Sequence, residues 1–303
     1  MTERGAARGS HSAAAASGAP RAWQVRWNRM PPERRWLTVV GGAVVLTAVV
    51  VAAVGPALWM ESALVMRTER LLEGPSWRHP LGTDQFGRDL LSRLLVGARP
   101  SVVVAFGAVG CATLAGTTVG VVVGSVGGLA DQVAMRAADV LFAFPGLLLA
   151  MAVMAVVGPS LRNLVLVLGL VYTPQFMRVA RASALAVRRE QYVEAAEALG
   201  ASRWRIVARH VAPNAMAPVL VQISLGLSLA VLAESALSFL GLGIQPPVPS
   251  WGNMLSEGRQ FMEIAPWNAI APGLAIALVV LGFNLLGDGL QELLDPRMRP
   301  EGL

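Results

Sequence analysis

Few residues in this 303-residue chain are of a type that can carry covalent or metal chemistry. All 25 basic residues are arginine, so a P-loop lysine and a Schiff-base lysine are both excluded. The single cysteine, Cys111, excludes a disulfide framework and a thiolate metal cluster. The three histidines, His11, His79 and His210, do not have the spacing of a metal site. The sequence therefore predicts no catalytic residue, no metal site and no cofactor.

One acid, Glu234, lies inside a long apolar run. Because an ionisable side chain is costly within a membrane, such a residue is a functional candidate by default. We favour a structural role, in which Glu234 caps or pairs with a neighbouring element, over contact with a substrate. An intramembrane enzyme would need a nucleophile with a base or a pair of carboxylates, and the sequence supplies neither.

The most informative spacing is in residues 188–214, RREQYVEAAEALGASRWRIVARHVAPN. One predicted helical face is apolar and holds Tyr192, Ala195, Ala196 and Leu199. A second face is acidic and holds Glu190, Glu194 and Glu197. Gly200 is expected to end this helix, and Ser202 can cap a second one that carries Trp204 among arginines. Pro213 then restarts the chain toward the next apolar run.

This pattern predicts two short helices joined by a sharp bend, with an apolar surface between an acidic and a basic flank. Such a surface suits docking into a groove on a soluble partner. The alternative is an amphipathic loop that lies on lipid headgroups.

The elements that must position this segment are membrane helices. Hydrophobic residues make up 54% of the chain and charged residues 15%, and the mean hydropathy is +0.56. A soluble domain has about 25% charged residues, so the composition indicates a polytopic membrane protein. The pI near 11.0 then reflects arginines at membrane surfaces and does not indicate a nucleic-acid partner.

Six spans are expected. They are residues 36–60, a helix within 100–130, a helix within 140–161, one that starts near 161 and continues past 177, 214–238 and 267–286. The remaining predicted segments are a polar tail over 1–35 that is disordered at its start, an external segment over 61–99, and a tail over 291–303, so that 100–290 forms a five-helix core with the loop 188–213. The first span is longer than the apolar part of a signal peptide, which is the other interpretation of residues 36–60.

The arginines predict the orientation of these spans. With both termini in the cytoplasm, the inner segments hold 17 of the 25 arginines and the outer segments hold 8. This excess satisfies the positive-inside rule, although six arginines in 61–99 count against it.

Small residues recur every four positions along the second span: Ala108, Ala112, Gly116, Gly120, Gly124 and Gly128. In lipid, small residues let helix backbones approach closely. We expect this stripe to pack within the chain, and a subunit interface is the alternative.

Glu194-Ala195-Ala196, followed by Gly200 and Pro213, resembles the EAA signature of inner-membrane permease subunits of ABC importers. Further segments resemble the dipeptide, oligopeptide and nickel branch of these permeases: HPLGTD (79–84), GRD (87–89), ESALSFLGLG (234–243), PSWGNM (249–254) and NLLGDG (284–289). The resemblance covers about residues 30–300 and is closest to the second, shorter sister permease.

The resemblance implies an all-α, six-helix type I importer permease in the inner (cytoplasmic) membrane. Two different permeases would form the pathway, two ATP-binding subunits would dock on the cytoplasmic face, and an external substrate-binding protein would deliver the substrate. The loop 188–213 would couple to one ATPase. The implied cargo is a di- or oligopeptide. The alternatives are a nickel or oligosaccharide importer of the same layout and, in a different class, a channel or scaffold subunit.

Overall fold

The computed structural model describes residues 31–294, and every regular element in that range is a helix. The long helices are α2 (Pro32–Leu64), α3 (Leu90–Val126), α6 (Leu161–Arg188), α10 (Met216–Phe239) and α12 (Trp267–Leu294). The short ones are η1 (Thr68–Arg70), α4 (Gly128–Phe142), α5 (Gly146–Val157), α7 (Gln191–Ala198), α8 (Arg203–Ile206), the π-helix η2 (Val207–Val211), α9 (Ala212–Asn214) and α11 (Trp251–Arg259). Residues 1–30 of the tail predicted over 1–35 and residues 295–303 of the tail predicted over 291–303 lie outside the described part, and the remaining residues of both tails that belong to helices extend α2 and α12 beyond the predicted spans.

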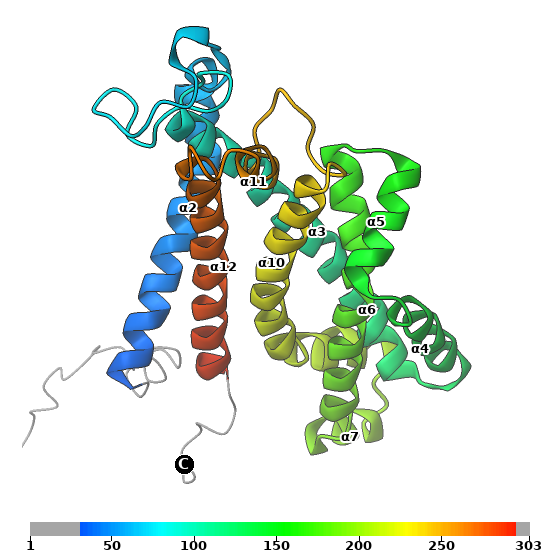
Figure 1. The fold of residues 1–303 in the computed structure, drawn as a ribbon. Coiled ribbons are helices and arrows are strands. Elements are labelled where there is room, and N and C mark those ends of the chain that lie inside the picture. Colours follow the sequence, from blue (N-terminus) through cyan, green and yellow to red (C-terminus); the bar gives the residue numbers. More distant parts are fainter. Residues whose placement is uncertain (1–30, 295–303) are drawn as a thin grey trace, which may run out of the picture.

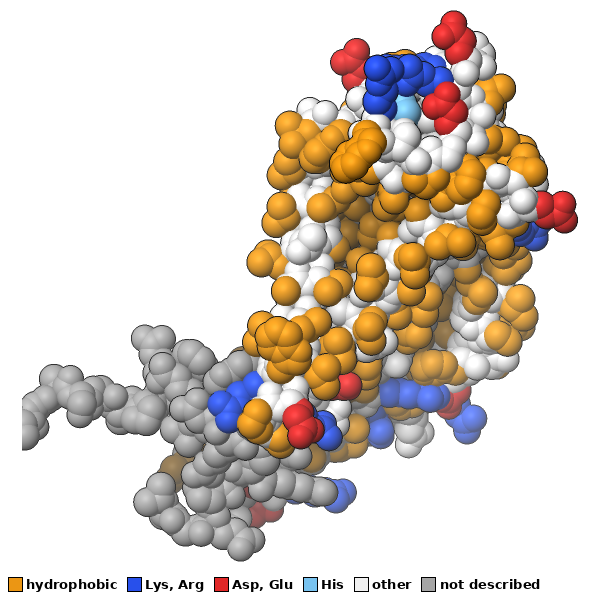
Figure 2. Space-filling view, turned by 60° about the vertical axis from the view of Figure 1, so that its left-hand side comes forward, with side chains coloured by type: hydrophobic (Ala, Val, Ile, Leu, Met, Phe, Trp, Pro, Cys, Tyr) orange, Lys and Arg blue, Asp and Glu red, His pale blue; other side chains and the backbone are white. Residues whose placement is uncertain are grey.

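The long helices form a bundle with two different ends (Figure 1). The segment between α2 and α3 and helix α11 lie at one end, and α7 lies at the other. Figure 2 shows hydrophobic side chains over the middle of the visible surface, with charged side chains gathered toward both ends. This is the distribution of a protein whose middle faces lipid and whose ends face water.

Five helices are long and apolar enough to cross a membrane, and a sixth span is possible if α4 and α5 are one broken helix. The expected all-α, six-helix fold is thus confirmed, but the third span is not a single helix within 140–161 as predicted. α4 and α5 meet at 83°, and α5 has only 12 residues. The break follows from Pro145, which disfavours helical geometry at Phe144 before it and stands at the N-cap of α5.

The second span also begins earlier than predicted. We expected the external segment to extend to residue 99, whereas α3 starts at Leu90. Asp89 caps it, because its carboxylate accepts a hydrogen bond from the backbone N–H of Ser92 at 2.8 Å. The first turns of α3 carry Arg93 and Arg99, so the boundary of the apolar run misplaces the start of the helix.

Helices α3 and α6 pack closely along the stripe of small residues. A Cβ atom added at Gly116 would lie 2.5 Å from the Thr173 carbonyl oxygen, and one at Gly120 would lie 2.3 Å from the Met177 carbonyl oxygen. Only glycine permits this backbone approach. The stripe therefore packs within the chain, as predicted, up to Gly124; at Gly128 a Cβ would meet open space.

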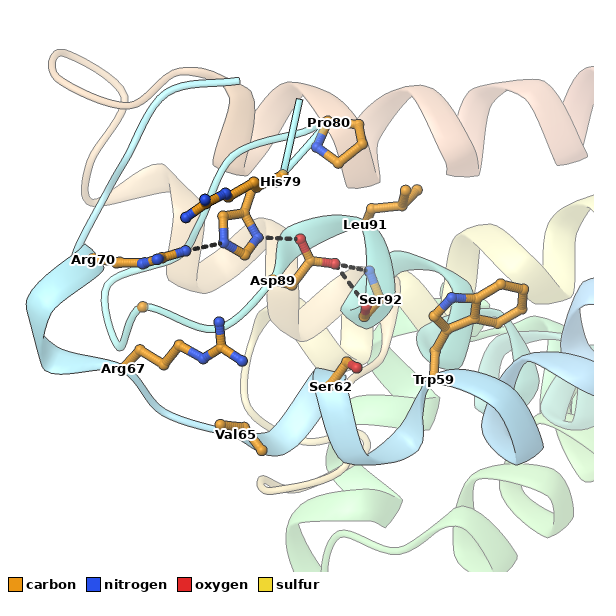
Figure 3. A pocket seen from close by; sticks show the side chains of 12 residues that line it. Trp59, Ser62, Val65, Arg67, Arg70, His79, Pro80, Asp89, Leu91 and Ser92 are labelled. Atoms are coloured by element: carbon orange, nitrogen blue, oxygen red, sulfur yellow. Dashed lines mark hydrogen bonds and ion pairs between the residues drawn. The ribbon is translucent and has the colours of Figure 1, made fainter. Parts of the chain in front are cut away.

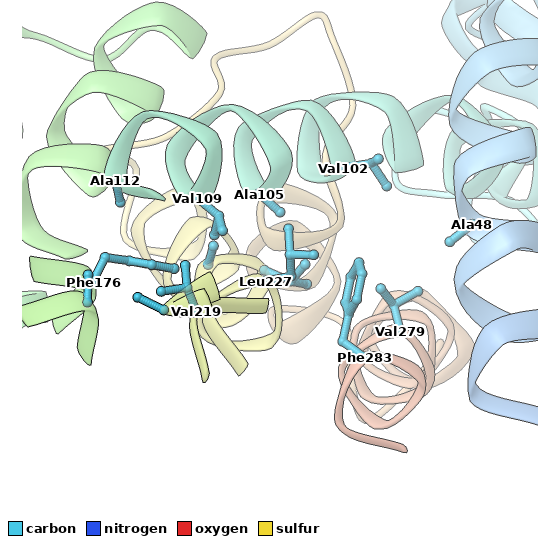
Figure 4. Close-up of a cluster of buried hydrophobic side chains, with 14 of the residues drawn as sticks. Ala48, Val102, Ala105, Val109, Ala112, Phe176, Val219, Leu227, Val279 and Phe283 are labelled. Carbon is cyan, nitrogen blue, oxygen red and sulfur yellow. The ribbon is translucent and has the colours of Figure 1, made fainter. Parts of the chain in front are cut away.

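The core between the helices is built from alanine, branched aliphatic and aromatic side chains (Figure 4). Val109 of α3, Phe176 of α6, Leu227 of α10 and Phe283 of α12 belong to one buried cluster. This cluster also contains Val193 from α7, so the short helix is continuous with the core of the bundle.

An ionic cluster fastens the segment between α2 and α3 to α11. Asp84 accepts hydrogen bonds from the side chains of Arg88, at 2.7 Å, and Arg93. Glu257 of α11 accepts from the same two arginines, at 3.3 and 2.9 Å. Asp84, Arg88 and Arg93 are buried, so the four charges compensate one another away from water.

Candidate functional site

The candidate site is the elbow formed by α7, α8 and η2, which covers most of the predicted loop 188–213. α7 ends at Ala198, and Gly200 adopts a φ of +81°. This left-handed conformation is open to glycine at little cost and reverses the chain direction before α8. Ser202 stands at the N-cap of α8, as predicted, but its side chain makes no capping hydrogen bond there.

Two apolar side chains hold the elbow against the bundle. Val193 of α7 is fully buried and Ile206 of α8 is 4% exposed, and both belong to the main core cluster. Arg188, the last residue of α6, donates a hydrogen bond to the backbone carbonyl of Ser125 at the end of α3. The elbow is thereby tied to two membrane helices. The sequence reasoning missed Val193 and Ile206, although their hydrophobicity and offset from the exposed face are a readable signal.

The outer surface of the elbow is apolar. The exposed fractions are 45% for Tyr192, 89% for Leu199 and 66% for Trp204. Ala195 is also exposed, so four apolar residues predicted for the coupling loop are accessible. The Tyr192 ring lies beside the His210 ring, with 6.3 Å between centroids.

The charged flanks of the elbow are exposed. The acids are Glu190, Glu194 and Glu197, and the arginines are Arg203, Arg205 and Arg209. Exposed charged and apolar groups on one bend are the features of a docking surface.

Ala196 and Pro213 are placed differently from the other predicted residues. Ala196 is half-buried and packs against the core cluster, because the helix turns it about 100° from Ala195. Pro213 lies in α9, beyond η2, where it leads into α10 and stands apart from the bend. Of the four residues expected on the apolar face, Tyr192, Ala195 and Leu199 are exposed and Ala196 is half-buried.

Glu234 lies far from the elbow, inside α10, and is completely buried. Its carboxylate accepts hydrogen bonds from the hydroxyls of Ser101 in α3, at 2.8 Å, and Ser238 in α10, at 2.7 Å. The Ser238 hydroxyl in turn accepts from the backbone N–H of Ile244, at 3.3 Å. Glu234 thus joins two membrane helices and the loop after α10.

The chain is similar to known transport proteins. Residues 116–300 match the family model described as binding-protein-dependent transport system inner membrane component. The chain belongs to this family. It is 43% identical over 263 residues to the dipeptide transport system permease protein DppC of Alkalihalophilus pseudofirmus, covering 87% of this chain and 86% of that protein. It is 41% identical over 283 residues to the glutathione transport system permease protein GsiD of Pectobacterium atrosepticum, covering 91% and 92%.

A third relative is the probable D,D-dipeptide transport system permease protein DdpC of Escherichia coli K12, at 40% identity over 264 residues, 86% of this chain and 88% of that protein. The family confirms the prediction of an ABC importer permease and of a transport component that is not an enzyme. Proteins of this family are inner membrane components that work with a substrate-binding protein.

Proposed function

We propose that this chain is the second permease subunit of an ATP-driven importer for di- or oligopeptides. The peptide cargo is inferred from relatives that this chain matches over most of their length. Their names give dipeptides, D,D-dipeptides and glutathione as the transported compounds. Nickel and oligosaccharide importers share the layout, but the relatives cited above are not named for either compound.

The elbow is the proposed coupling element. It presents Tyr192, Leu199 and Trp204 to water on one side and inserts Val193 and Ile206 into the bundle on the other. A partner that grips the outer face therefore moves α6 and α3 together with it, as a rigid body. Since the chain contains no lysine for a P-loop, the proposed partner is a separate ATP-binding subunit.

The proposed assembly has two different permeases, two ATP-binding subunits and an external binding protein. In it, the elbow and both termini face the cytoplasm. The arginine excess on that side supports this orientation. The segment between α2 and α3 then faces outward, toward the binding protein.

Glu234 is proposed to be structural. The hydroxyls of two serines donate hydrogen bonds to its carboxylate, and its side chain has no access to solvent. A residue that selects substrate must be reachable from the pathway, so these contacts favour helix fastening over transport chemistry.

The test is reconstitution of the chain with its sister permease, ATPases and binding protein in lipid vesicles. We expect ATP hydrolysis to be stimulated by binding protein loaded with a dipeptide, and the labelled dipeptide to accumulate inside. Binding protein without ligand is the control. Stimulation and uptake with nickel ions in place of the dipeptide would reject the peptide assignment, and an active complex lacking ATPase subunits would reject the importer.

A further inference from the structure

A cavity of about 510 Å³ lies where α2 ends and α3 begins (Figure 3). The segment between these two helices is at the opposite end of the bundle from α7 (Figure 1). The last turns of α2 contribute Trp59 and Ser62 to it, and the first turn of α3 contributes Leu91 and Ser92. Both helices continue from there into the apolar middle of the bundle. The floor of the cavity therefore lies at the boundary between membrane and water, where tryptophan is favoured.

The upper wall of the cavity is strongly basic. Arg67, Arg70 and Arg78 all line it, and none of the three forms an ion pair within residues 31–294. The carboxylate among the lining residues is Asp89, and its oxygens already accept hydrogen bonds from His79, at 2.8 Å, and from Ser92. The cavity therefore carries an uncompensated positive charge.

A hydrogen-bonded relay holds one of these arginines in place (Figure 3). The Arg70 guanidinium lies 3.0 Å from Nε2 of His79, and Nδ1 of His79 lies 2.8 Å from Oδ1 of Asp89. Arginine can only donate, so Nε2 accepts and the ring proton is on Nδ1, which donates to Asp89. A hydrogen bond to this ring, and not an ion pair, therefore holds Arg70 and leaves its charge available to a ligand.

The backbone beside Arg67 is fixed by a close approach. Gly87 has a φ of +69°, and a Cβ there would lie 1.9 Å from the Arg67 carbonyl oxygen. The Arg67 backbone N–H also donates to the Phe86 carbonyl at 3.1 Å. The Arg67 backbone and the Arg70 side chain are therefore held before any ligand arrives, which lowers the entropic cost of binding.

We propose that this cavity binds the phosphate of an anionic phospholipid headgroup. Guanidinium groups match phosphate oxygens in geometry and charge. Trp59, Val65 and Leu91 supply an apolar edge for the adjoining glycerol and acyl carbons. Basic pockets between membrane helices are suited to such headgroups. The proposal does not depend on the transport function.

The test uses the purified full-length chain with bound lipid measured by native mass spectrometry. We expect retention of phosphatidylglycerol over phosphatidylcholine. The double variant Arg67→Gln/Arg78→Gln should lose this preference by about tenfold or more, since each arginine at a membrane surface contributes roughly 1 kcal/mol. The control is Arg162→Gln, which removes an exposed arginine from the first turn of α6 and should behave as the wild type.

Both substituted arginines are exposed and lack ion pairs in the described part of the chain, so the lipid-free melting temperature should not change. Unchanged phosphatidylglycerol retention in the double variant would overturn the proposal, as would an equal loss in Arg162→Gln. Displacement of the lipid by inorganic phosphate at equal concentration would assign the site to a soluble anion and overturn the lipid source. A single Arg78→Gln variant with an intermediate loss would support it.

Discussion

At the residue scale, the elbow depends most on the backbone of Gly200. A Cβ at this position would meet no atom within 4 Å, so any penalty on substitution is conformational and not steric crowding. At a φ of +81° a β-branched residue is strained by about 1–3 kcal/mol. We therefore expect Gly200→Val to insert into the membrane but to lose ATPase co-purification and peptide uptake.

The matched control is Gly200→Asn, because asparagine tolerates the left-handed region far better than valine. It should keep most of the uptake. Equal loss in both variants would mean that the side chain and not the backbone angle is harmful.

The buried charges near the outer end yield a second expectation. Asp84→Asn leaves the guanidinium groups of Arg88 and Arg93 with Glu257 as their remaining carboxylate. Removing one partner from a buried ionic cluster costs about 3 kcal/mol or more. The melting temperature in detergent should therefore fall clearly.

The control for Asp84→Asn is Asp139→Asn. Asp139 pairs with Arg178 at 2.6 Å, but the two side chains are 55% and 46% exposed. Such a pair contributes about 1 kcal/mol or less. If both variants melt alike, the four-charge cluster does not stabilise the fold.

Glu234 is tested by comparing two substitutions. Glu234→Gln keeps an acceptor oxygen for the Ser101 or Ser238 hydroxyl, whereas Glu234→Leu removes the acceptor of both hydroxyl donors at a cost of about 2 kcal/mol. We expect the leucine variant to be less stable and the glutamine variant to transport nearly normally. Normal stability with abolished uptake in Glu234→Gln would instead place this residue in the transport pathway.

At the element scale, the sequence predicted most helices but not their ends. The span 36–60 lies within α2 and 267–286 within α12, because long charge-free runs report the lipid-facing middle of a helix. Hydropathy did not predict the start of α3 at Leu90, because the first turns of this helix carry charges that are compensated within a buried ionic cluster. Hydropathy did not predict the bend between α4 and α5, because it contains no information on the backbone geometry that Pro145 imposes.

The elbow also has features that the sequence predicted and features that it did not. Its helical spacing and the break at Gly200 were predictable, since periodicity and glycine act locally. Val193 and Ile206 as anchors, and the inward turn of Ala196, depend on contacts with distant helices. The hydrophobicity of Val193 and Ile206 marks them as candidates for this role, but only the contacts show which apolar side of the short helix meets the bundle.

At the scale of the whole molecule, the orientation of the chain in the membrane can be tested by cysteine labelling. Cysteine introduced at Leu199 and at Trp77, in a Cys111→Ala background, places exposed thiols at opposite ends of the bundle. A membrane-impermeant maleimide added to intact cells should label Trp77→Cys alone. Leu199→Cys should react only after permeabilisation, and labelling of Leu199→Cys in intact cells would contradict the proposed topology.

The central claim is that the elbow docks an ATP-binding subunit, and the most direct measurement is co-purification of the co-expressed ATPases with Leu199→Ser/Trp204→Ser. The matched control is Trp36→Ser, since Trp36 is 67% exposed and Trp204 is 66% exposed. Loss of two apolar anchors from an interface is expected to reduce the captured ATPase by about tenfold or more, with no change in the melting temperature of the permease. Capture by the double variant equal to that by Trp36→Ser would contradict the account.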